Sequence, residues 1–307
     1  MKVFITGGAG FLGRHLVGRL TALGHQVIAP SREEMDLTLS GSLDRLADNG
    51  ADREYDQIYH LAVWTRSGSF CRRRGGEQWL ANSAMDGEVL RWWWQRQPQA
   101  KLIALGTSGA YSPGLTDLRE EDYLFGEPDE SLFGYAMAKR SLYAGMRALG
   151  EQAGLRYLYL IPSSLYGLDY HQDGRDLHLV YDLAREVLRA ARGGAPVVVW
   201  GDGHQRRELL PVADAVSWML ELADTVGGEI VNLATGEDHS IRDLVGQLCE
   251  LAGHPFDRVE FDLSRSTGIR SRILDSTKID ALLPNRQKTL LRDGLAETLS
   301  WVAETLL

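Results

Sequence analysis

The stretch KVFITGGAGFLG, residues 2–13, decides the fold class of this chain. Its first five residues are mostly apolar or β-branched, as a buried strand requires, and apolar residues after Gly10 recur at helical spacing. Gly7 would permit a tight turn, Gly10 would let the backbone approach a pyrophosphate, and Gly13 would allow close packing of helix and strand. This order predicts a dinucleotide-binding unit, and a glycine turn without a ligand is the alternative.

The start of the predicted helix supplies the chemistry for binding phosphates. The first N–H groups of a helix have no partner within it and carry a partial positive charge. We therefore expect the residues of this turn to hold the pyrophosphate of a dinucleotide: Gly7, Gly10, Phe11, Leu12 and Gly13.

Short β-branched runs then alternate with helical patterns, which is typical of a parallel sheet with crossover helices. The expected strands are 2–6, 26–29, 57–61, 102–105, 157–161, 197–200 and 230–233. The expected helices after the first are 39–49, 81–95, 135–152, 177–191, 212–222 and 241–251. The prediction is an α/β protein with a doubly wound parallel Rossmann sheet. Residues 1–165 form the nucleotide-binding domain, to which 205–236 returns, and 166–307 form a smaller interleaved α/β region that binds substrate.

The composition excludes several classes of protein. The chain has 307 residues and a net charge of −9, with 44% hydrophobic and 24% charged residues, which excludes a disordered or coiled-coil chain. The acidic balance argues against nucleic acid as a partner. Cys71 and Cys249 have no metal-ligand spacing, so we expect neither a disulfide nor a metal site. The first apolar run ends at Gly7 and none reaches the roughly 18 residues of a membrane helix, so we expect a cytoplasmic protein.

The end of the second strand indicates which dinucleotide binds. An acidic residue there suits the ribose hydroxyl of NAD, whereas an arginine suits the 2′-phosphate of NADP. The sequence reads Ser31-Arg32-Glu33, so a hydroxyl and a guanidinium precede any carboxylate. We therefore favour NADP(H), with NAD as the alternative if Arg32 is only solvated and paired with Glu33 or Glu34.

Tyr135 and Lys139 form a candidate catalytic pair. They are four residues apart in a predicted helix, so the phenol and the ammonium reach one point. A nearby ammonium would lower the pKa of the tyrosine from about 10 toward the range of a general acid or base. Thr107 and Ser108 follow a predicted strand, where either hydroxyl could hydrogen-bond a carbonyl oxygen. A cap or turn is the alternative for these hydroxyls.

These motifs, in this order, resemble the extended short-chain dehydrogenase/reductase superfamily of nucleotide-sugar epimerases, dehydratases and reductases. Further similar segments are His60-Leu61-Ala62, Asn82, Gly201-Asp202-Gly203 with Arg207 and Asp214, and 232–236. The resemblance implies that Tyr135 donates a proton, that Thr107 hydrogen-bonds the same oxygen, and that Lys139 tunes the tyrosine and holds the nicotinamide ribose.

Within the superfamily, the chain resembles the GDP-L-fucose synthases, which are NADP-dependent 3,5-epimerase/4-reductases. The similar segments are 31–37, 105–111, 162–167, 200–214 and 264–275. The resemblance implies these cofactor contacts: Ser31, Arg32, Asp36, Leu61, Ala62 and Pro162. It implies these substrate contacts: Ser164, His178, Trp200 and Arg207. Arg207 would bind the pyrophosphate, and His178 would be an active-site histidine; a neutral, hydrogen-bonded helix residue is the alternative for His178.

Two departures from this family affect the expected reaction. The cysteine that serves epimerisation in the family is Gly109 here, and Ser164 replaces an asparagine. Removal of a proton beside a ketone needs a positioned base, and glycine supplies none. Cys71 is a poor replacement, because it lies in a basic segment with Arg72 to Arg74.

The sequence therefore predicts an NADPH-dependent 4-ketoreductase of a GDP- or dTDP-linked 4-keto-6-deoxysugar. The alternatives are a 4-epimerase with tightly bound NAD, a bifunctional epimerase/reductase, and a non-catalytic NADP-binding regulatory protein. The three tryptophans at 92–94 span most of a helical turn, so one buried ring or a subunit interface could explain them. We expect a homodimer.

Overall fold

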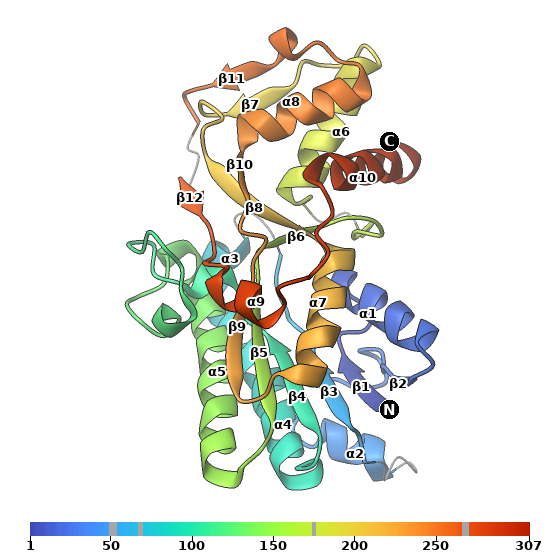
Figure 1. Cartoon of the computed structure of the whole chain (residues 1–307), viewed down its shortest axis with the longest axis vertical. Coiled ribbons are helices and arrows are strands. Elements are labelled where there is room, and N and C mark those ends of the chain that lie inside the picture. The colour runs from blue at the N-terminus through green and yellow to red at the C-terminus, as the bar shows by residue number, and fades with distance from the viewer. Residues whose placement is uncertain (49–53, 67–69, 174–175, 266–269) are drawn as a thin grey trace.

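The computed structural model describes residues 1–48, 54–66, 70–173, 176–265 and 270–307. In Figure 1, a large parallel sheet with helices on both faces forms the lower part, and a smaller group of strands and helices lies above it. The predicted α/β class and doubly wound sheet are confirmed.

The large sheet has six strands, and every pairing within it is parallel. In spatial order the strands are β2 (Gln26–Ile28), β1 (Lys2–Thr6), β3 (Gln57–His60), β4 (Lys101–Leu105), β5 (Tyr157–Pro162) and β9 (Glu229–Leu233). The chain reverses direction across the sheet between β1 and β3. Ligands of such sheets bind outside the carboxyl ends of the strands at this point.

Helices cover both faces of this sheet. One face carries α1 (Phe11–Ala22) and α7 (Val212–Thr225), which contact each other. The other carries α4 (Gly75–Arg96) and α5 (Phe133–Ala153), which form a long helix pair. Three short helices complete this part: α2 (Ser42–Asp48) beside α4, α3 (Phe70–Arg73), and α9 (Thr277–Leu282) beside β9.

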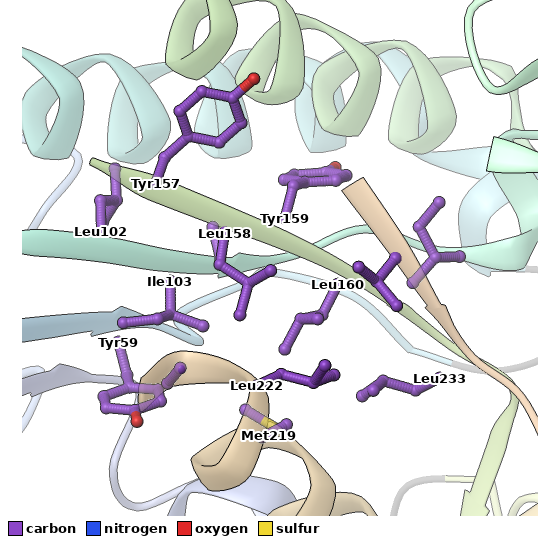
Figure 2. Close-up of a cluster of buried hydrophobic side chains, with 14 of the residues drawn as sticks. Tyr59, Leu102, Ile103, Tyr157, Leu158, Tyr159, Leu160, Met219, Leu222 and Leu233 are labelled. Atoms are coloured by element: carbon purple, nitrogen blue, oxygen red, sulfur yellow. The ribbon is translucent and has the colours of Figure 1, made fainter. Parts of the chain in front are cut away.

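The strand period of two explains how one strand serves both layers of the core. Figure 2 shows Tyr157 and Tyr159 on the helix-pair side of β5, while Leu158 and Leu160 lie on the other side with Met219 of α7. All four β5 side chains are buried. Parallel strands covered on both faces are expected to be apolar throughout. This strand could therefore be predicted from the sequence.

The smaller part is built around a second sheet. Its strands are β10 (Asp238–Ser240), β8 (Arg206–Pro211) and β12 (Ser271–Arg272), with β6 (Ser164–Tyr166) also pairing with β8. A two-stranded sheet pairs β7 (Val198–Trp200) with β11 (Glu260–Asp262). Three helices pack together beside them: α6 (Leu179–Ala191), α8 (Ile241–Ala252) and α10 (Leu291–Thr305). The 3₁₀ helices are η1 (Ser108–Ala110), η2 (Glu120–Asp122), η3 (Glu130–Leu132) and η4 (Phe256–Arg258).

Local signals explain where the helices of the smaller part begin. Ser240 accepts a hydrogen bond from the Asp243 backbone N–H at 3.0 Å, and the Asp243 carboxylate accepts one from the Ser240 N–H. This capping box starts α8 at the next residue. Helix α6 buries a single apolar stripe at helical spacing, which packs against α8 and α10.

Several element boundaries differ from the predictions. The helix expected at 81–95 begins at Gly75, and the helix expected at 39–49 begins at Ser42 and is described only to Asp48, since residue 49 lies outside the described residues. Residues 206–211 pair within the smaller sheet, whereas 212–233 contribute α7 and β9 to the large part. Helix α10 and the strands β6, β8, β10, β11 and β12 were not predicted.

The first turn tests the fold directly. A Cβ at Gly13 would lie 2.2 Å from the Gly7 carbonyl oxygen, whereas a Cβ at Gly18 in the same helix meets nothing within 4 Å. We expect Gly13→Ala to lower the free energy of unfolding by about 2 kcal/mol or more through overpacking. Gly18→Ala should raise it by about 0.5–1 kcal/mol through helix propensity. Urea unfolding of both variants measures this, and equal stabilities would contradict the close packing.

Candidate active site

The candidate site lies at the carboxyl ends of β1, β3, β4 and β5, where the large sheet faces the smaller part (Figure 1). Gly7 has a φ of +72°, and a Cβ there would lie 2.6 Å from the Ala62 nitrogen. The turn therefore packs directly against Leu61 and Ala62 at the end of β3. Its conformation requires glycine both for the backbone angle and for space.

The beginning of α1 is open to an anion. Gly10 is the N-cap, no side chain caps the helix, and its first turn contains no acidic residue. The first backbone N–H groups, including those of Phe11 and Leu12, are the donors that such an end presents. The close backbone packing at Gly7 and Gly13 leaves no room for side chains, and the uncapped helix start beside them suits the pyrophosphate of a dinucleotide.

The loop after β2 does not pair Arg32 with Glu33 or Glu34 among the described residues. The Ser31 N–H donates to the Glu34 carboxylate at 2.7 Å, so Glu34 closes its own turn. Arg32 is exposed, and in the described part of the chain it forms no ion pair. Asp36 accepts from the Thr38 hydroxyl at 2.7 Å; this bond, the Thr38 N–H and the charge of Arg32 hold the pKa of Asp36 below its usual value.

The structure brings Thr107 and Tyr135 together. Tyr135 lies in the first turn of α5, and the side chain of Thr107, which precedes η1, lies close enough to its phenol to lower the pKa. The Thr107 Oγ1 also accepts from the Gly109 N–H at 3.1 Å. Thr107 therefore caps the 3₁₀ helix and contacts the phenol at once. Ser108 is the first residue of η1 and is partly buried.

Burial controls the acid–base properties of this pair. It raises the pKa of Tyr135 well above its usual value, although the Thr107 side chain opposes this. The expected lowering of this pKa is therefore wrong for the structure, because burial raises the pKa and the neighbouring Cys71 and Asp86 raise it further. Lys139 lies one turn on and is 3% exposed. Burial lowers its pKa as well, and the carboxylate of Asp86 opposes that shift.

Two arginines lie side by side in the smaller sheet, across the site from Thr107 and Tyr135. The parallel pairing of β8 and β12 sets Arg207 beside Arg272, and the charge of Arg207 adds to burial in lowering the pKa of Arg272. In the described part of the chain neither guanidinium is in an ion pair. Both arginines are partly buried, and Asp129 acts on Arg272 only through its charge, so this pair is suited to an anionic ligand.

His178 lies near Arg207, whose charge acts on its ring. It is the N-cap of α6, so it is not an interior helix residue, and its buried Nδ1 has no hydrogen-bond partner among the described residues. Burial and the charge of Arg207 lower its pKa, so the ring is neutral at neutral pH.

Gly109 lies between Thr107 and Arg272. A Cβ there would lie 2.9 Å from the Leu132 Cδ1, 3.3 Å from the Thr107 Oγ1 and 3.5 Å from the Arg272 Nη1. The Arg272 guanidinium thus lies against the position where the resemblance placed a cysteine. Arg272 was not singled out from the sequence, although it lies within the similar segment 264–275.

The remaining predicted residues are less closely grouped. Pro162 ends β5, and Ser164 begins β6 two residues later. Trp200 is 56% exposed and stacks with Arg265 at 4.9 Å, and no hydrogen bond, ion pair or ring contact joins it to Tyr135 in the described chain. Cys71 is buried on α3, near enough to Tyr135 for its charge to raise the pKa of the phenol.

The described residues form neither a metal cluster nor a membrane-spanning helix. Among the described residues, no group of three or more histidine, cysteine, aspartate and glutamate side chains could hold a metal ion. Within the same ranges, none of the helices combines the length and apolar character needed to cross a bilayer.

A parallel Rossmann sheet with a glycine turn and a Thr–Tyr–Lys group at its carboxyl edge defines the extended short-chain dehydrogenase/reductase class. Residues 3–234 match the model of the NAD dependent epimerase/dehydratase family, and the chain belongs to this family. The family membership predicted from the motifs is confirmed.

Individual relatives match over nearly the whole chain. A dTDP-4-dehydro-6-deoxy-D-allose reductase from Streptomyces is 28% identical over 97% of this chain and 95% of its own. A GDP-L-fucose synthase from Azorhizobium caulinodans is also 28% identical, with the same coverage. Among solved structures, a GDP-mannoheptose C4 reductase from Campylobacter jejuni with NADP bound superposes with a TM-score of 0.85, at 20% identity, over 98% of both chains.

Proposed function

We propose that this protein is an NADPH-dependent 4-ketoreductase of a nucleotide-activated 4-keto-6-deoxysugar. The observation that carries the proposal is the arrangement of two groups with Gly109 between them. Thr107 and Tyr135 lie on one side, and Arg207 and Arg272, which form no ion pair among the described residues, lie on the other. The first group suits a ketone under reduction, and the second suits a pyrophosphate. The names of the relatives, which include reductases of dTDP- and GDP-linked sugars, support the same substrate class.

The cofactor would be NADP(H), with NAD as the alternative. Gly7, Gly10 and Gly13 would hold its pyrophosphate at the start of α1, where no side chain intrudes. Ser31 and Arg32 would meet the 2′-phosphate, and the NADP-bound relative supports this choice. When bound, the reduced nicotinamide supplies the hydride that reaches C4 of the sugar.

Tyr135 would donate the proton that completes the alcohol. Its raised pKa keeps the phenol protonated at neutral pH, as a proton donor requires. Thr107 would hydrogen-bond the same oxygen, and Lys139 would stabilise the phenolate left behind and hold the nicotinamide ribose. The phenolate then regains its proton from solvent, so one hydride and one proton are consumed for each ketone reduced.

The substrate would bind between the two sheets. Arg207 and Arg272 would hold the pyrophosphate, with His178 and Ser164 beside the sugar. Trp200 would lie at the outer rim, consistent with its exposure.

Epimerisation is expected to be absent. Epimerisation needs a base that removes a proton at C3 or C5 of the sugar. Gly109 has no side chain that could act as this base, and Arg272 lies against that position. Cys71 is the group whose place near Tyr135 favours the bifunctional alternative.

A second copy of the chain is the partner proposed for the α4–α5 helix pair. Trp92 and Trp93 are buried whereas Trp94 is 44% exposed, so two rings belong to the core and one is left at the surface. Trp79 of α4 and Phe133 of α5 are exposed as well. Aromatic side chains of this kind are enriched in subunit interfaces.

The first test is NADPH oxidation with GDP- and dTDP-4-keto-6-deoxysugars. We expect turnover with one of these sugars and about a thousandfold lower kcat in Tyr135→Phe, because the proton donor is removed while the ring remains. NADPH binding by the variant, measured by nicotinamide fluorescence, should be retained. Absence of turnover, or full activity in the variant, would refute the proposal. Co-purified NAD⁺ without net NADPH consumption would indicate the 4-epimerase instead.

The second test follows epimerisation in deuterated water. We expect the reduced product to carry no deuterium at C3 or C5, since Gly109 provides no base. Mass and NMR analysis of the product measures this. Deuterium at either carbon would contradict the expectation, and its loss in Cys71→Ala would then identify Cys71 as the base.

The third test concerns the two arginines. We expect Arg207→Ala and Arg272→Ala each to raise the KM for the nucleotide sugar by about 10- to 100-fold, the value of one charge-assisted hydrogen bond to phosphate. Arg206→Ala is the matched control, because Arg206 neighbours Arg207 on β8 but is exposed and paired with Asp238. Equal KM values in all three variants would exclude this pair as the pyrophosphate site.

A further inference from the structure

Three buried polar side chains form a chain beneath the proposed catalytic pair. Thr6 ends β1, His60 ends β3, and Asp86 lies in the middle of α4. The Thr6 Oγ1 lies 2.7 Å from the His60 Nδ1, and the His60 Nε2 lies 2.8 Å from the Asp86 Oδ1. Thr6 and His60 are 0% exposed and Asp86 is 4% exposed. None of the three side chains has a role in the proposed reaction.

The hydrogen bonds of this chain run in one direction. The Ala62 N–H donates to the Thr6 Oγ1 at 3.2 Å, which leaves the hydroxyl proton for another acceptor. An ionised carboxylate only accepts, so the His60 Nε2 donates to Asp86, and in a neutral ring the Nδ1 then accepts from Thr6. The series of hydrogen bonds therefore ends at the Asp86 carboxylate, which accepts a hydrogen bond and is held in one orientation.

The other oxygen of this carboxylate is unused. The Asp86 Oδ2 is buried and has no hydrogen-bond partner among the described residues. A buried carboxylate in this condition is costly unless an opposite charge lies near it. Lys139 is a buried cation on α5, the helix that packs along α4, and it forms no ion pair among the described residues. The charge of Asp86 acts on Lys139 across this helix contact, and Tyr135 lies within range of the same charge.

We propose that Asp86 is a positioning residue: held by Thr6 and His60, it is the buried counter-charge of Lys139. The inference rests on the proposed function, in which Lys139 acts as an ammonium. The chain also starts beside the cofactor turn, since Thr6 precedes Gly7. It thus links the end of β1 through buried side chains to α4, which packs along the helix that carries Tyr135 and Lys139.

The titratable groups around Lys139 come from four other elements. Asp86 of α4 and His60 of β3 lie on one side, and Tyr159 of β5 donates its hydroxyl to the Lys139 carbonyl at 2.7 Å. Cys71 of α3 lies near Tyr135, which is on the same helix as Lys139. Of these groups, Asp86 is the one whose charge stabilises the ammonium against burial.

The test is the pH dependence of Asp86→Asn, which keeps the shape and removes the charge. Burial depresses the pKa of Lys139, and without Asp86 it falls further, so the ammonium is lost at a lower pH as the pH rises. We expect the alkaline limbs of kcat/KM and of NADPH affinity to move down by about one pH unit, with values near pH 6 within about threefold of the wild type. Asp86→Glu, which restores the charge, should move both limbs back.

Glu88→Gln is the matched control. Glu88 is a buried carboxylate on the same helix, but it accepts from the backbone of Gly41 and Leu43 and does not face Lys139. We expect lower stability in this variant and unchanged alkaline limbs. An unmoved limb in Asp86→Asn, or a loss equal at every pH, would overturn the proposal.

Two further measurements keep the test decisive. If Asp86→Asn does not fold, Thr6→Val removes the far end of the chain at constant volume and should shift the limbs in the same direction by a smaller amount. An unmoved limb in that folded variant would count against the proposal. NADPH binding requires no turnover, so a protein that binds NADPH but reduces no 4-keto sugar refutes the proposed function and still permits this test.

Discussion

The close approach of backbone atoms in the first turn determines where the rest of the site lies. At Gly7 and Gly13, a Cβ would come within 2.6 Å and 2.2 Å of backbone atoms, so β1, α1 and the end of β3 meet without intervening side chains. This contact directs the open end of α1 toward the carboxyl edge of the sheet. It also places Thr6 against His60, so the packing that forms an anion cradle simultaneously sets the first link of a buried polar chain.

Burial is the dominant electrostatic influence at the other end of that chain. It raises the pKa of Tyr135 and lowers that of Lys139, so both side chains are driven toward their neutral forms. The neutral form suits a phenol that donates a proton, but it would deprive the lysine of the charge that stabilises the resulting phenolate. A counter-charge at Asp86 answers this conflict, because in a poorly hydrated interior each charge acts more strongly on its neighbours. Burial therefore keeps Tyr135 as a neutral phenol, while Asp86 helps to keep Lys139, one helical turn away, as a charged ammonium.

The sequence predicted the elements that carry their own periodicity, and it missed those that depend on partners. The β5 run is apolar on both faces and was predicted, whereas β12 has two residues that only pairing with β8 holds extended. Helix α10 was not predicted; it contains Gly294, which is needed where a Cβ would lie 2.3 Å from the Tyr166 hydroxyl. Likewise Tyr135 and Lys139 share one helical motif, while Arg272 reaches Gly109 from a distant segment. No spacing rule connects such residues.

In the proposed reaction, the missing base at Gly109 and the anion site at Arg272 have one structural origin. Arg272 lies against the space that a side chain at this position would enter, and its strand pairing sets it beside Arg207. An acidic chain of net charge −9 thus places two arginines side by side at this site, where the charge of Asp129 acts on Arg272 but neither arginine forms an ion pair within the described residues. In the proposed reaction, that guanidinium would bind phosphate while closing the space needed for proton removal from the sugar. Reduction without epimerisation then follows from packing as much as from the missing thiol.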